Sequence, residues 1–331
     1  MTTTPTRSAP HPHLSFDPAP DPWRGAHVLS MRRYRREDLE DLFHHTDALR
    51  SGPAASTRLA GRVLVSAFYQ SSTRTRLAHE AAMLRMGGTC TGFADAGVTR
   101  AGDFFAETPE DIARMLGGYG DLVVVRHPCT GTADRFASAA GVPVVNAGDG
   151  WGEHPTQAMT DLYTMRGFRG GLDGATIALT GDLRMRTMRS VLLGLRHYRC
   201  QLLLVPGPGM APDPALIEEV AGGRARVERR PSVADAVPAA DFVYMEPVVQ
   251  PDYTVGRSAA PAHKPATPPE YRVDRALLED WARPHLRVLH SLPRQDELST
   301  DLDDTPFNGY WTQARNGVPV RMALLDLMLG A

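Results

Sequence analysis

The segment Ser-Ser-Thr-Arg-Thr-Arg at residues 71–76 carries the strongest structural signal of this chain. It follows an apolar, β-rich segment at 63–69 and opens a helix-like segment at 77–86, which closes on two glycines. The first turn of a helix leaves backbone N–H groups unpaired and bears a partial positive charge, so cations are disfavoured there. Two arginines and several hydroxyls at this turn therefore indicate an anion site, and phosphate is the usual anion. On local grounds, the alternative is an N-cap followed by two solvated arginines.

Other polar side chains fall where two further predicted strands end. A buried parallel strand at 122–125 is followed directly by Arg126, and a short strand at 142–146 leads through a Gly-rich turn to His154 and Gln157. Ligands of open α/β sheets bind beyond the carboxyl ends of the strands. Together with the Ser-Thr-Arg-Thr segment, these side chains predict one site at a sheet edge.

Alternating strands and helices continue along the chain and predict an α/β fold with parallel sheets. The first series ends near residue 165. The second series is predicted as strands 176–180, 201–205, 241–245 and 287–290, and helices 187–198, 214–221 and 274–281. A length of 331 residues also favours two domains. Residues 1–25 are rich in Pro, Thr and Ser and lack an apolar signal core, so we expect a disordered extension and not a targeting peptide.

Composition excludes several classes of function. A net charge of −2 gives no reason to expect nucleic acid or an anionic membrane as partner, and no apolar run is long enough to span a membrane. The cysteines Cys90, Cys129 and Cys200 are scattered, which argues against a disulfide framework or a zinc site. Neither predicted strand-to-helix turn carries G-x-G-x-x-G, so a dinucleotide-binding oxidoreductase is disfavoured. We expect no metal and no cofactor.

Several motifs, in this order, resemble the aspartate/ornithine carbamoyltransferase family, and most closely the aspartate carbamoyltransferase catalytic chain. The matching segments are FYQSSTRTR at 68–76, VRHP at 125–128, NAGDG at 146–150, HPTQ at 154–157, GDL at 181–183, RT at 186–187, LHSLPR at 289–294 and the NG…RMALL segment at 316–325. The resemblance covers roughly residues 30–331.

The resemblance implies two doubly wound parallel-sheet domains joined by helices. Residues 26–165 would form a carbamoyl-phosphate-binding domain, and residues 166–311 an acceptor-binding domain. The C-terminal helix, 312–331, would pack back on the first domain. It also implies a cytoplasmic homotrimer with active sites shared between subunits, acting in pyrimidine biosynthesis or in specialised metabolism.

Carbamoyl transfer needs a phosphate clamp, a polarised carbonyl group and an unprotonated amine held in line. The residues expected to bind carbamoyl phosphate are Ser72, Thr73, Arg74, Thr75, Arg126, His154, Gln157 and Leu292. Those expected to be catalytic are Arg74, Thr75, Arg126, His154 and Gln157. Arg126 and His154 would stabilise charge on the carbonyl oxygen, and Gln157 would accept a hydrogen bond from the carbamoyl amino group. No nucleophilic side chain is needed, because phosphate is already a good leaving group.

The acceptor side departs from the family pattern. The expected acceptor-binding residues are Arg186, Thr187, Glu246, Gln250, Leu292 and Pro293. Arg186 and Thr187 match the residues that hold the acceptor α-carboxylate, but Pro247 stands at or next to the arginine that pairs with the second carboxylate of aspartate. Glu246 would repel an acidic side chain and attract an amino group. The alternative is that Glu246 is a solvated acid and that Arg257 replaces the missing arginine.

A second departure lies in the loop at 97–107, which in the family reaches the neighbouring subunit's site with a serine and a lysine. Here the corresponding residues are Thr99 and Arg100, and the loop has no lysine. Aspartate is the acceptor that overall resemblance favours, whereas these substitutions favour a different amine, such as a diamino acid. The competing function is a non-catalytic carbamoyltransferase-like binding or scaffold subunit.

Overall fold

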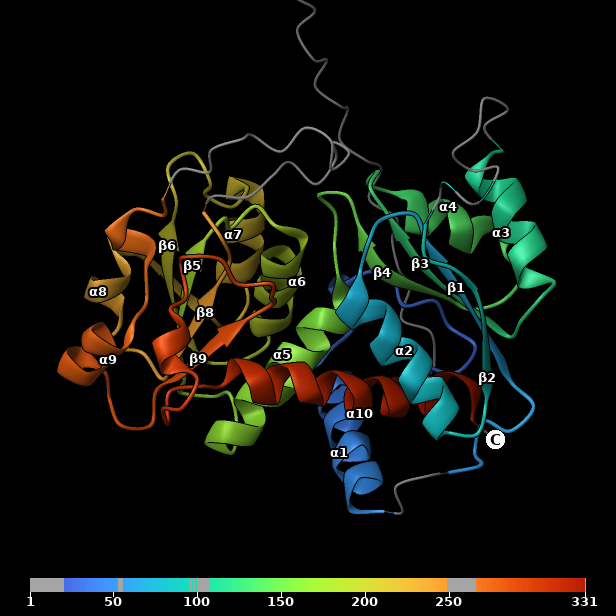
Figure 1. The fold of residues 1–331 in the computed structure, drawn as a ribbon, viewed down its shortest axis with the longest axis horizontal. Helices are drawn as coiled ribbons and strands as arrows, with labels where there is room; N and C mark the ends of the chain where they lie inside the picture. The colour runs from blue at the N-terminus through green and yellow to red at the C-terminus, as the bar shows by residue number, and fades with distance from the viewer. Residues whose placement is uncertain are drawn as a thin grey trace, which may run out of the picture.

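A computed structural model describes residues 21–52, 56–95, 97, 99, 107–248 and 266–330 of the chain. Two parallel β-sheets lie side by side, each with helices packed against it, and long helices run between them (Figure 1). The predicted α/β class with two parallel sheets is therefore confirmed.

The first sheet has four strands in the order β2-β1-β3-β4, and every neighbouring pair is parallel. The strands are β1 (Val63–Phe68), β2 (Thr89–Phe93), β3 (Leu122–His127) and β4 (Val144–Asp149). β1 and β3 lie in the middle and are almost continuously apolar, as central strands covered on both faces have to be. The helices of this half are α2 (Thr73–Arg85), α3 (Pro109–Gly117) and α4 (Thr132–Ala139).

The second sheet has five strands in the order β7-β6-β5-β8-β9, again all parallel. The strands are β5 (Thr176–Gly181), β6 (Gln201–Pro206), β7 (Arg226–Arg229), β8 (Phe242–Met245) and β9 (Arg287–His290). The helices are α6 (Arg186–Leu195), α7 (Pro214–Ala221), α8 (Val233–Ala236) and α9 (Arg275–Trp281), and the short 3-10 turns of the chain are η1 (Met31–Arg33), η5 (Pro269–Tyr271) and η6 (Thr300–Leu302). In both sheets, order and direction place the strand ends that carry polar residues along one edge.

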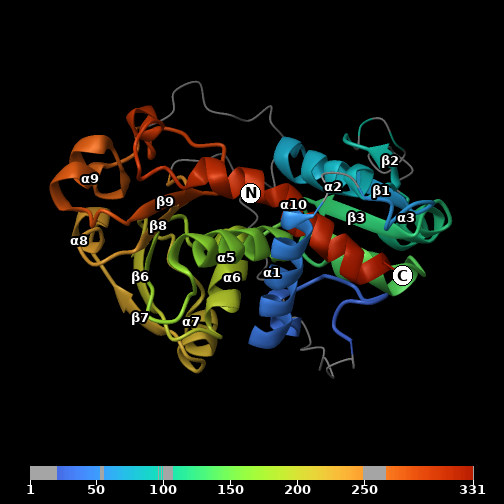
Figure 2. The same ribbon diagram turned by 90° about the horizontal axis from the view of Figure 1, so that it is seen from below.

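Three long helices connect the two halves: α1 (Arg36–Ser51), α5 (Pro155–Arg169) and α10 (Tyr310–Leu329). α10 packs against α1, α2 and α5 and also reaches β9, so the last helix contacts a helix of the first half and a strand of the second sheet. Figure 2 shows α10 running beneath both halves, with α1 crossing it. The C-terminal helix thus returns to the first half, as the resemblance implied.

The prediction of a disordered extension over residues 1–25 is wrong for its last five residues. Residues 1–20 lie outside the described residues, but residues 21–25 belong to the folded domain. Trp23 is buried and stacks on Tyr34 with ring centroids 4.5 Å apart, and the N–H of Gly25 donates to the carbonyl of Met328 at 3.1 Å. The prediction was wrong here because it rested on a Pro-rich composition, which does not reveal that a large aromatic side chain is buried.

Candidate active site

Helix α2 begins directly after β1, with Ser72 as its N-cap and Thr73 as its first residue. This places Arg74 and Thr75 in the first turn, as the sequence predicted. Neither first-turn position is acidic, and the Ser72 side chain does not cap the helix. The Arg74 guanidinium crosses to the other half of the molecule, where its Nη2 donates to the carbonyl of Leu292 at 2.5 Å. The helix start therefore faces the second domain across a narrow gap.

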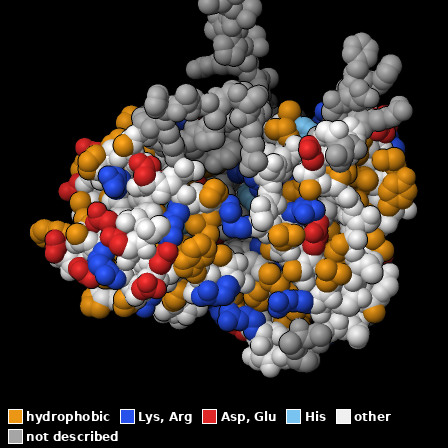
Figure 3. All heavy atoms as spheres, in the orientation of Figure 1, with side chains coloured by type: hydrophobic (Ala, Val, Ile, Leu, Met, Phe, Trp, Pro, Cys, Tyr) orange, Lys and Arg blue, Asp and Glu red, His pale blue; other side chains and the backbone are white. Residues whose placement is uncertain are grey.

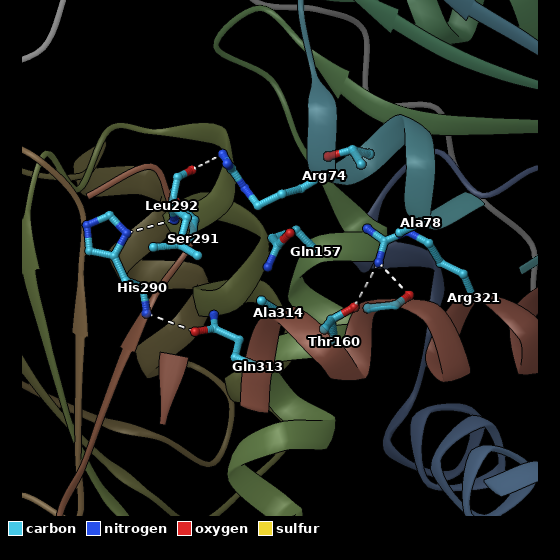
Figure 4. A pocket seen from close by; sticks show the side chains of 12 residues that line it. Arg74, Ala78, Gln157, Thr160, His290, Ser291, Leu292, Gln313, Ala314 and Arg321 are labelled. Carbon is cyan, nitrogen blue, oxygen red and sulfur yellow. Dashed lines mark hydrogen bonds between the residues drawn. The ribbon is translucent and has the colours of Figure 1, made fainter. Parts of the chain in front are cut away.

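A pocket lies in this gap, and its lining comes from four parts of the chain (Figure 4). The lining residues are Arg74, Thr75 and Ala78 of α2, Gln157 and Thr160 of α5, the segment His290, Ser291 and Leu292, and Gln313, Ala314, Gly317 and Arg321 of α10. Four of the predicted site residues, namely Arg74, Thr75, Gln157 and Leu292, thus meet around one cavity.

Leu292 sits in an unusual backbone conformation. Its φ of +60° lies in the left-handed region, which side chains other than glycine seldom adopt, and a cis peptide bond joins it to Pro293. The N–H of Leu292 donates to His290 Nδ1 at 2.7 Å, and His290 Nε2 lies 2.9 Å from Glu297 Oε1. His290 and Glu297 are fully buried, so a buried hydrogen-bonded pair stabilises the turn that carries the Leu292 carbonyl.

Arg126 and Arg186 approach each other over Gly148, although Arg126 lies in strand β3 of the first half and Arg186 begins helix α6 of the second half. A Cβ atom at Gly148 would lie 3.0 Å from Arg186 Nε and 3.2 Å from Arg126 Nη1. Gly148 also has a φ of +111°, so only glycine suits this position. Arg126 Nη1 donates to the carbonyl of Ala147 at 3.2 Å. Arginine side chains border the hollow between the two halves (Figure 3), which makes this part of the site attractive to anions.

His154 is the N-cap of α5 and is buried between the two halves. Its N–H donates to Ser190 Oγ of α6 at 2.9 Å, and its ring Nε2 lies 3.3 Å from Thr75 Oγ1. Burial, and then the charges of Arg126 and Arg186, hold the pKa of His154 well below its usual 6.5. The imidazole is therefore neutral at physiological pH. Nδ1 is buried without a hydrogen-bond partner among the described residues, and an orphaned acceptor is tolerated better than an orphaned N–H. This favours the tautomer with its proton on Nε2, beside Thr75.

Gln157 reaches the pocket one turn further along α5. Its Nε2 donates to Asp161 Oδ1 at 2.7 Å, and Asp161 is completely buried. The sequence interpretation missed Asp161 and the two other side chains that donate to it, Gln313 and Tyr244. The spacing of Gln157 and Asp161, four residues apart on one helix, was the available signal.

On the acceptor side, Glu246 is buried and not solvated, so that part of the alternative interpretation is wrong. Thr187 Oγ1 donates to Glu246 Oε1 at 2.5 Å. Burial raises the pKa of Glu246 above 4.5, while nearby His290 and hydrogen bonds from Thr187 and Ser291 oppose the rise. Arg186 begins α6 and is buried as well, with Nη2 donating to Gln70 Oε1 at 3.0 Å. The acceptor side thus combines a buried cation with a buried acid.

Three predicted or alternative residues lie outside the described residues, namely Arg100, Gln250 and Arg257. Thr99 is described and is half-buried, but most of the loop around it is not described. Within the described ranges, no three His, Cys, Asp or Glu side chains are grouped so that they could hold a metal ion. No helix in the described part of the chain is long and apolar enough to cross a membrane.

The chain matches two family models along most of its length. Residues 26–167 match the aspartate/ornithine carbamoyltransferase carbamoyl-P binding domain, and residues 173–328 match the Asp/Orn binding domain of the same family. The chain is 40% identical to the aspartate carbamoyltransferase catalytic subunit of Thermofilum pendens over 93% of this chain and 96% of that protein. The corresponding subunit of Hyperthermus butylicus is 38% identical over 93% and 97%.

Solved structures agree with these relatives. Aspartate transcarbamoylase from Trypanosoma cruzi in complex with carbamoyl phosphate and aspartate superimposes with a TM-score of 0.82 at 30% identity, covering 93% of this chain and 98% of that one. The same enzyme in complex with N-(phosphonacetyl)-L-aspartic acid gives a TM-score of 0.82 at 29% identity, over 96% and 99%. The fold, the order of the motifs and these similarities lead to one conclusion: the chain belongs to the aspartate/ornithine carbamoyltransferase family.

Proposed function

We propose that this carbamoyltransferase moves the carbamoyl group of carbamoyl phosphate to the amino group of an amino acid and releases phosphate. The observation that carries the proposal is the convergence of Arg74, Thr75, Gln157 and Leu292 on one pocket between the two sheets. Such a gap admits two substrates, one from each half, and holds them against each other. None of the relatives reported above favours the competing function, a non-catalytic binding subunit.

The first half suits the phosphate end of carbamoyl phosphate. The start of α2 offers backbone N–H groups, the hydroxyls of Ser72, Thr73 and Thr75 stand beside them, and Arg74 adds a positive charge. Arg126, near the end of β3, approaches Arg186 over Gly148 and would neutralise charge as phosphate departs.

The carbamoyl end would face His154 and Gln157. A neutral His154 with its proton on Nε2 donates one hydrogen bond to the carbonyl oxygen, and this bond strengthens as negative charge builds up there. Gln157 would accept from the carbamoyl amino group. The amine attacks the carbonyl carbon, the C–O bond to phosphate breaks, and the amine loses a proton. The Leu292 carbonyl would bind amino groups at this point, and the buried His290–Glu297 pair that holds its turn supports this role.

The acceptor would enter from the second half. Arg186 would hold the α-carboxylate, and its approach to Arg126 over Gly148 supports this role. L-aspartate is the acceptor that the relatives favour, and with it the reaction would belong to pyrimidine biosynthesis. A second candidate rests on a specific observation: buried Glu246 accepts the hydrogen bond of the Thr187 hydroxyl, and buried Pro247 follows it. The family resemblance implies an arginine at or next to the position of Pro247 in the aspartate enzymes. An acceptor with an amino or neutral polar side chain suits this arrangement better than a second carboxylate.

The test is a panel of amines incubated with carbamoyl phosphate, with phosphate release and the mass of the carbamoylated product both measured. L-aspartate, L-ornithine and 2,3-diaminopropionate form the core of the panel. Product with at least one amino acid, at a rate well above the spontaneous breakdown of carbamoyl phosphate, is the expected result. Phosphate release that no amine accelerates contradicts the proposal.

We also propose a homotrimer with active sites shared between subunits, supported by the family resemblance and by the polar, glycine-containing sequence of the loop at 97–107. Mixing Arg100→Ala chains with Arg74→Ala chains should then restore about a quarter of the sites in randomly assembled trimers. Each variant, dissociated and reassembled alone, is the control. A fully active monomer in sedimentation contradicts the shared site. The cytoplasmic location stays a prediction.

A further inference from the structure

A buried carboxylate lies directly beneath the pocket. Asp161 is on α5, one turn after Gln157, and has no exposed surface. Three donors converge on it: Gln157 Nε2 at 2.7 Å and Gln313 Nε2 at 2.6 Å on Oδ1, and the Tyr244 hydroxyl at 2.8 Å on Oδ2. They come from α5, α10 and β8, so this one side chain joins elements from both halves of the molecule.

This convergence determines how two glutamine side chains are turned. An ionised carboxylate only accepts hydrogen bonds, so each glutamine has to direct its NH₂ group toward Asp161. The oxygen of Gln313 then accepts from the N–H of His290 at 2.8 Å. The oxygen of Gln157 lies on the side of Arg74, within the pocket (Figure 4). The two ends of an amide have nearly the same shape, and only their hydrogen-bond partners distinguish them.

We propose that Asp161 is a positioning residue that fixes the amide of Gln157 so that its oxygen, and not its NH₂ group, faces the carbamoyl group. The inference rests on the proposed function, because it needs a carbamoyl NH₂ group as the hydrogen-bond donor. If the Gln157 amide were reversed, its NH₂ group would face the NH₂ group of the carbamoyl moiety. The substrate would then lose a hydrogen bond and meet electrostatic repulsion. Without a fixed acceptor beneath it, Gln157 would populate both orientations.

The same carboxylate also supports the opposite wall of the pocket. Through Gln313 it holds the N–H of His290, and His290 in turn accepts from the N–H of Leu292. Leu292 is the residue whose carbonyl meets Arg74. Asp161 therefore positions a group that would bind the carbamoyl end and a group that would bind the amines, through one continuous chain of hydrogen bonds.

The protonation state of Asp161 gives this arrangement a signature in the pH profile. Burial raises the pKa of Asp161 to about 7, with the nearby Glu246 charge adding to the rise and the three hydrogen bonds opposing it. Above that pH the carboxylate accepts from both amides. Below it, the protonated acid donates from one oxygen, and a glutamine can satisfy it with its own oxygen and turn its NH₂ group into the pocket. Activity should therefore fall as the pH drops through about 7.

Several other titratable and charged groups lie near Asp161. Tyr244 has a pKa well above 10, and Arg321, which faces Asp161 from α10, has a pKa of about 10, so neither changes charge near pH 7. His79, beyond Arg321 on α2, has a pKa well below 6.5. Glu246 also has a raised pKa, and a separate variant distinguishes it.

The test is a double-mutant cycle with Asp161→Asn and Gln157→Ala. Asparagine keeps the size and can still accept, but it can also donate, so it no longer dictates the amide orientation. In the native background, Asp161→Asn should lower kcat about tenfold or more. In the Gln157→Ala background it should lower kcat several-fold less, because only the contribution through Gln313 and His290 remains. An equal loss in both backgrounds shows that Asp161 acts independently of Gln157 and overturns the proposal. Asp326→Asn, at a buried carboxylate of α10 paired with His45 and Arg58, is the control that should lower thermal stability and leave kcat unchanged.

The pH profile gives a second readout, which keeps the proposal testable if Asp161→Asn folds poorly. Tyr244→Phe removes one donor from the carboxylate and raises its pKa further, so the acidic limb of kcat should move to higher pH. Glu246→Gln removes a neighbouring negative charge and should move the limb to lower pH without abolishing it. An acidic limb that neither variant moves contradicts the inference. If the native enzyme carbamoylates no amine, the proposed function itself fails, whereas an active native enzyme with an additive cycle contradicts this inference alone.

Discussion

The candidate site has two walls, one contributed by the first half of the molecule and one by the second half. The two walls differ in how closely they match the pattern that the family resemblance implies. On the first wall, Arg74, Arg126, His154 and Gln157 all stand at strand or helix ends, where the sequence placed them. On the second wall, Arg186 keeps its place, but a buried acid and a proline follow β8. The residues that match the family motifs thus dominate one wall, and the departure from those motifs lies on the other.

The difference follows from what each wall would have to recognise. The family models describe the first half as a carbamoyl-P binding domain and the second half as an Asp/Orn binding domain. The second wall would therefore meet the acceptor, and a single buried charge is enough to change which acceptor is preferred. Buried charges act strongly because little water screens them, and Glu246 and Arg186 are both buried.

The most severe test of the first wall is Arg74→Ala. We expect kcat/KM for carbamoyl phosphate to fall about a thousandfold, or ~4 kcal/mol, because a charge-assisted phosphate contact is lost. Thermal stability should change little, since the side chain is exposed at the gap. Arg85→Ala, at the other end of α2 and also exposed, is the matched control and should keep full activity. Near-normal activity of Arg74→Ala would remove the phosphate clamp from the proposed mechanism.

The second largest effect is expected for His154→Ala. We expect kcat to fall about a hundredfold, or ~2.7 kcal/mol, because the lost hydrogen bond matters most in the transition state. Binding of carbamoyl phosphate, measured by calorimetry, should change much less. Because the pKa of His154 lies well below 6.5, its protonation should affect the native rate only at pH values below 6.5. Lost binding with an unchanged kcat would instead make His154 a ground-state contact.

The smallest effect, and the one that sharpens the comparison, concerns the second wall. Glu246→Gln keeps the volume and the contact with Thr187 but removes the charge. The ratio of kcat/KM for L-aspartate to that for L-ornithine should rise about tenfold, or ~1.4 kcal/mol. Glu228→Gln, an exposed acid on β7, is the control and should leave the ratio unchanged. If the native enzyme already prefers L-aspartate a hundredfold, Glu246 does not set the acceptor.

Much of this molecule was predictable because its signals are local. Strands such as 122–125 are short apolar runs, and the helix after the Ser-Thr-Arg-Thr segment begins where unpaired N–H groups and hydroxyls coincide. The carboxyl ends of parallel strands share one edge, so Arg126 and His154 could be assigned to a common site from the order of elements alone. The error at residues 21–25 has the opposite cause, since the burial of Trp23 against Tyr34 depends on a distant packing partner.

By itself, the sequence determined the α/β class, the two parallel sheets, the family and the polar groups at the strand ends, because these depend on periodicity and on short motifs. Only the tertiary structure decided what lies between those groups. It buried Glu246 against Thr187, brought Arg126 and Arg186 together over Gly148, and placed Asp161 beneath Gln157, Gln313 and Tyr244. These contacts join residues up to 152 positions apart. Burial and hydrogen-bond orientation arise from packing in three dimensions, and no local pattern in the chain specifies them.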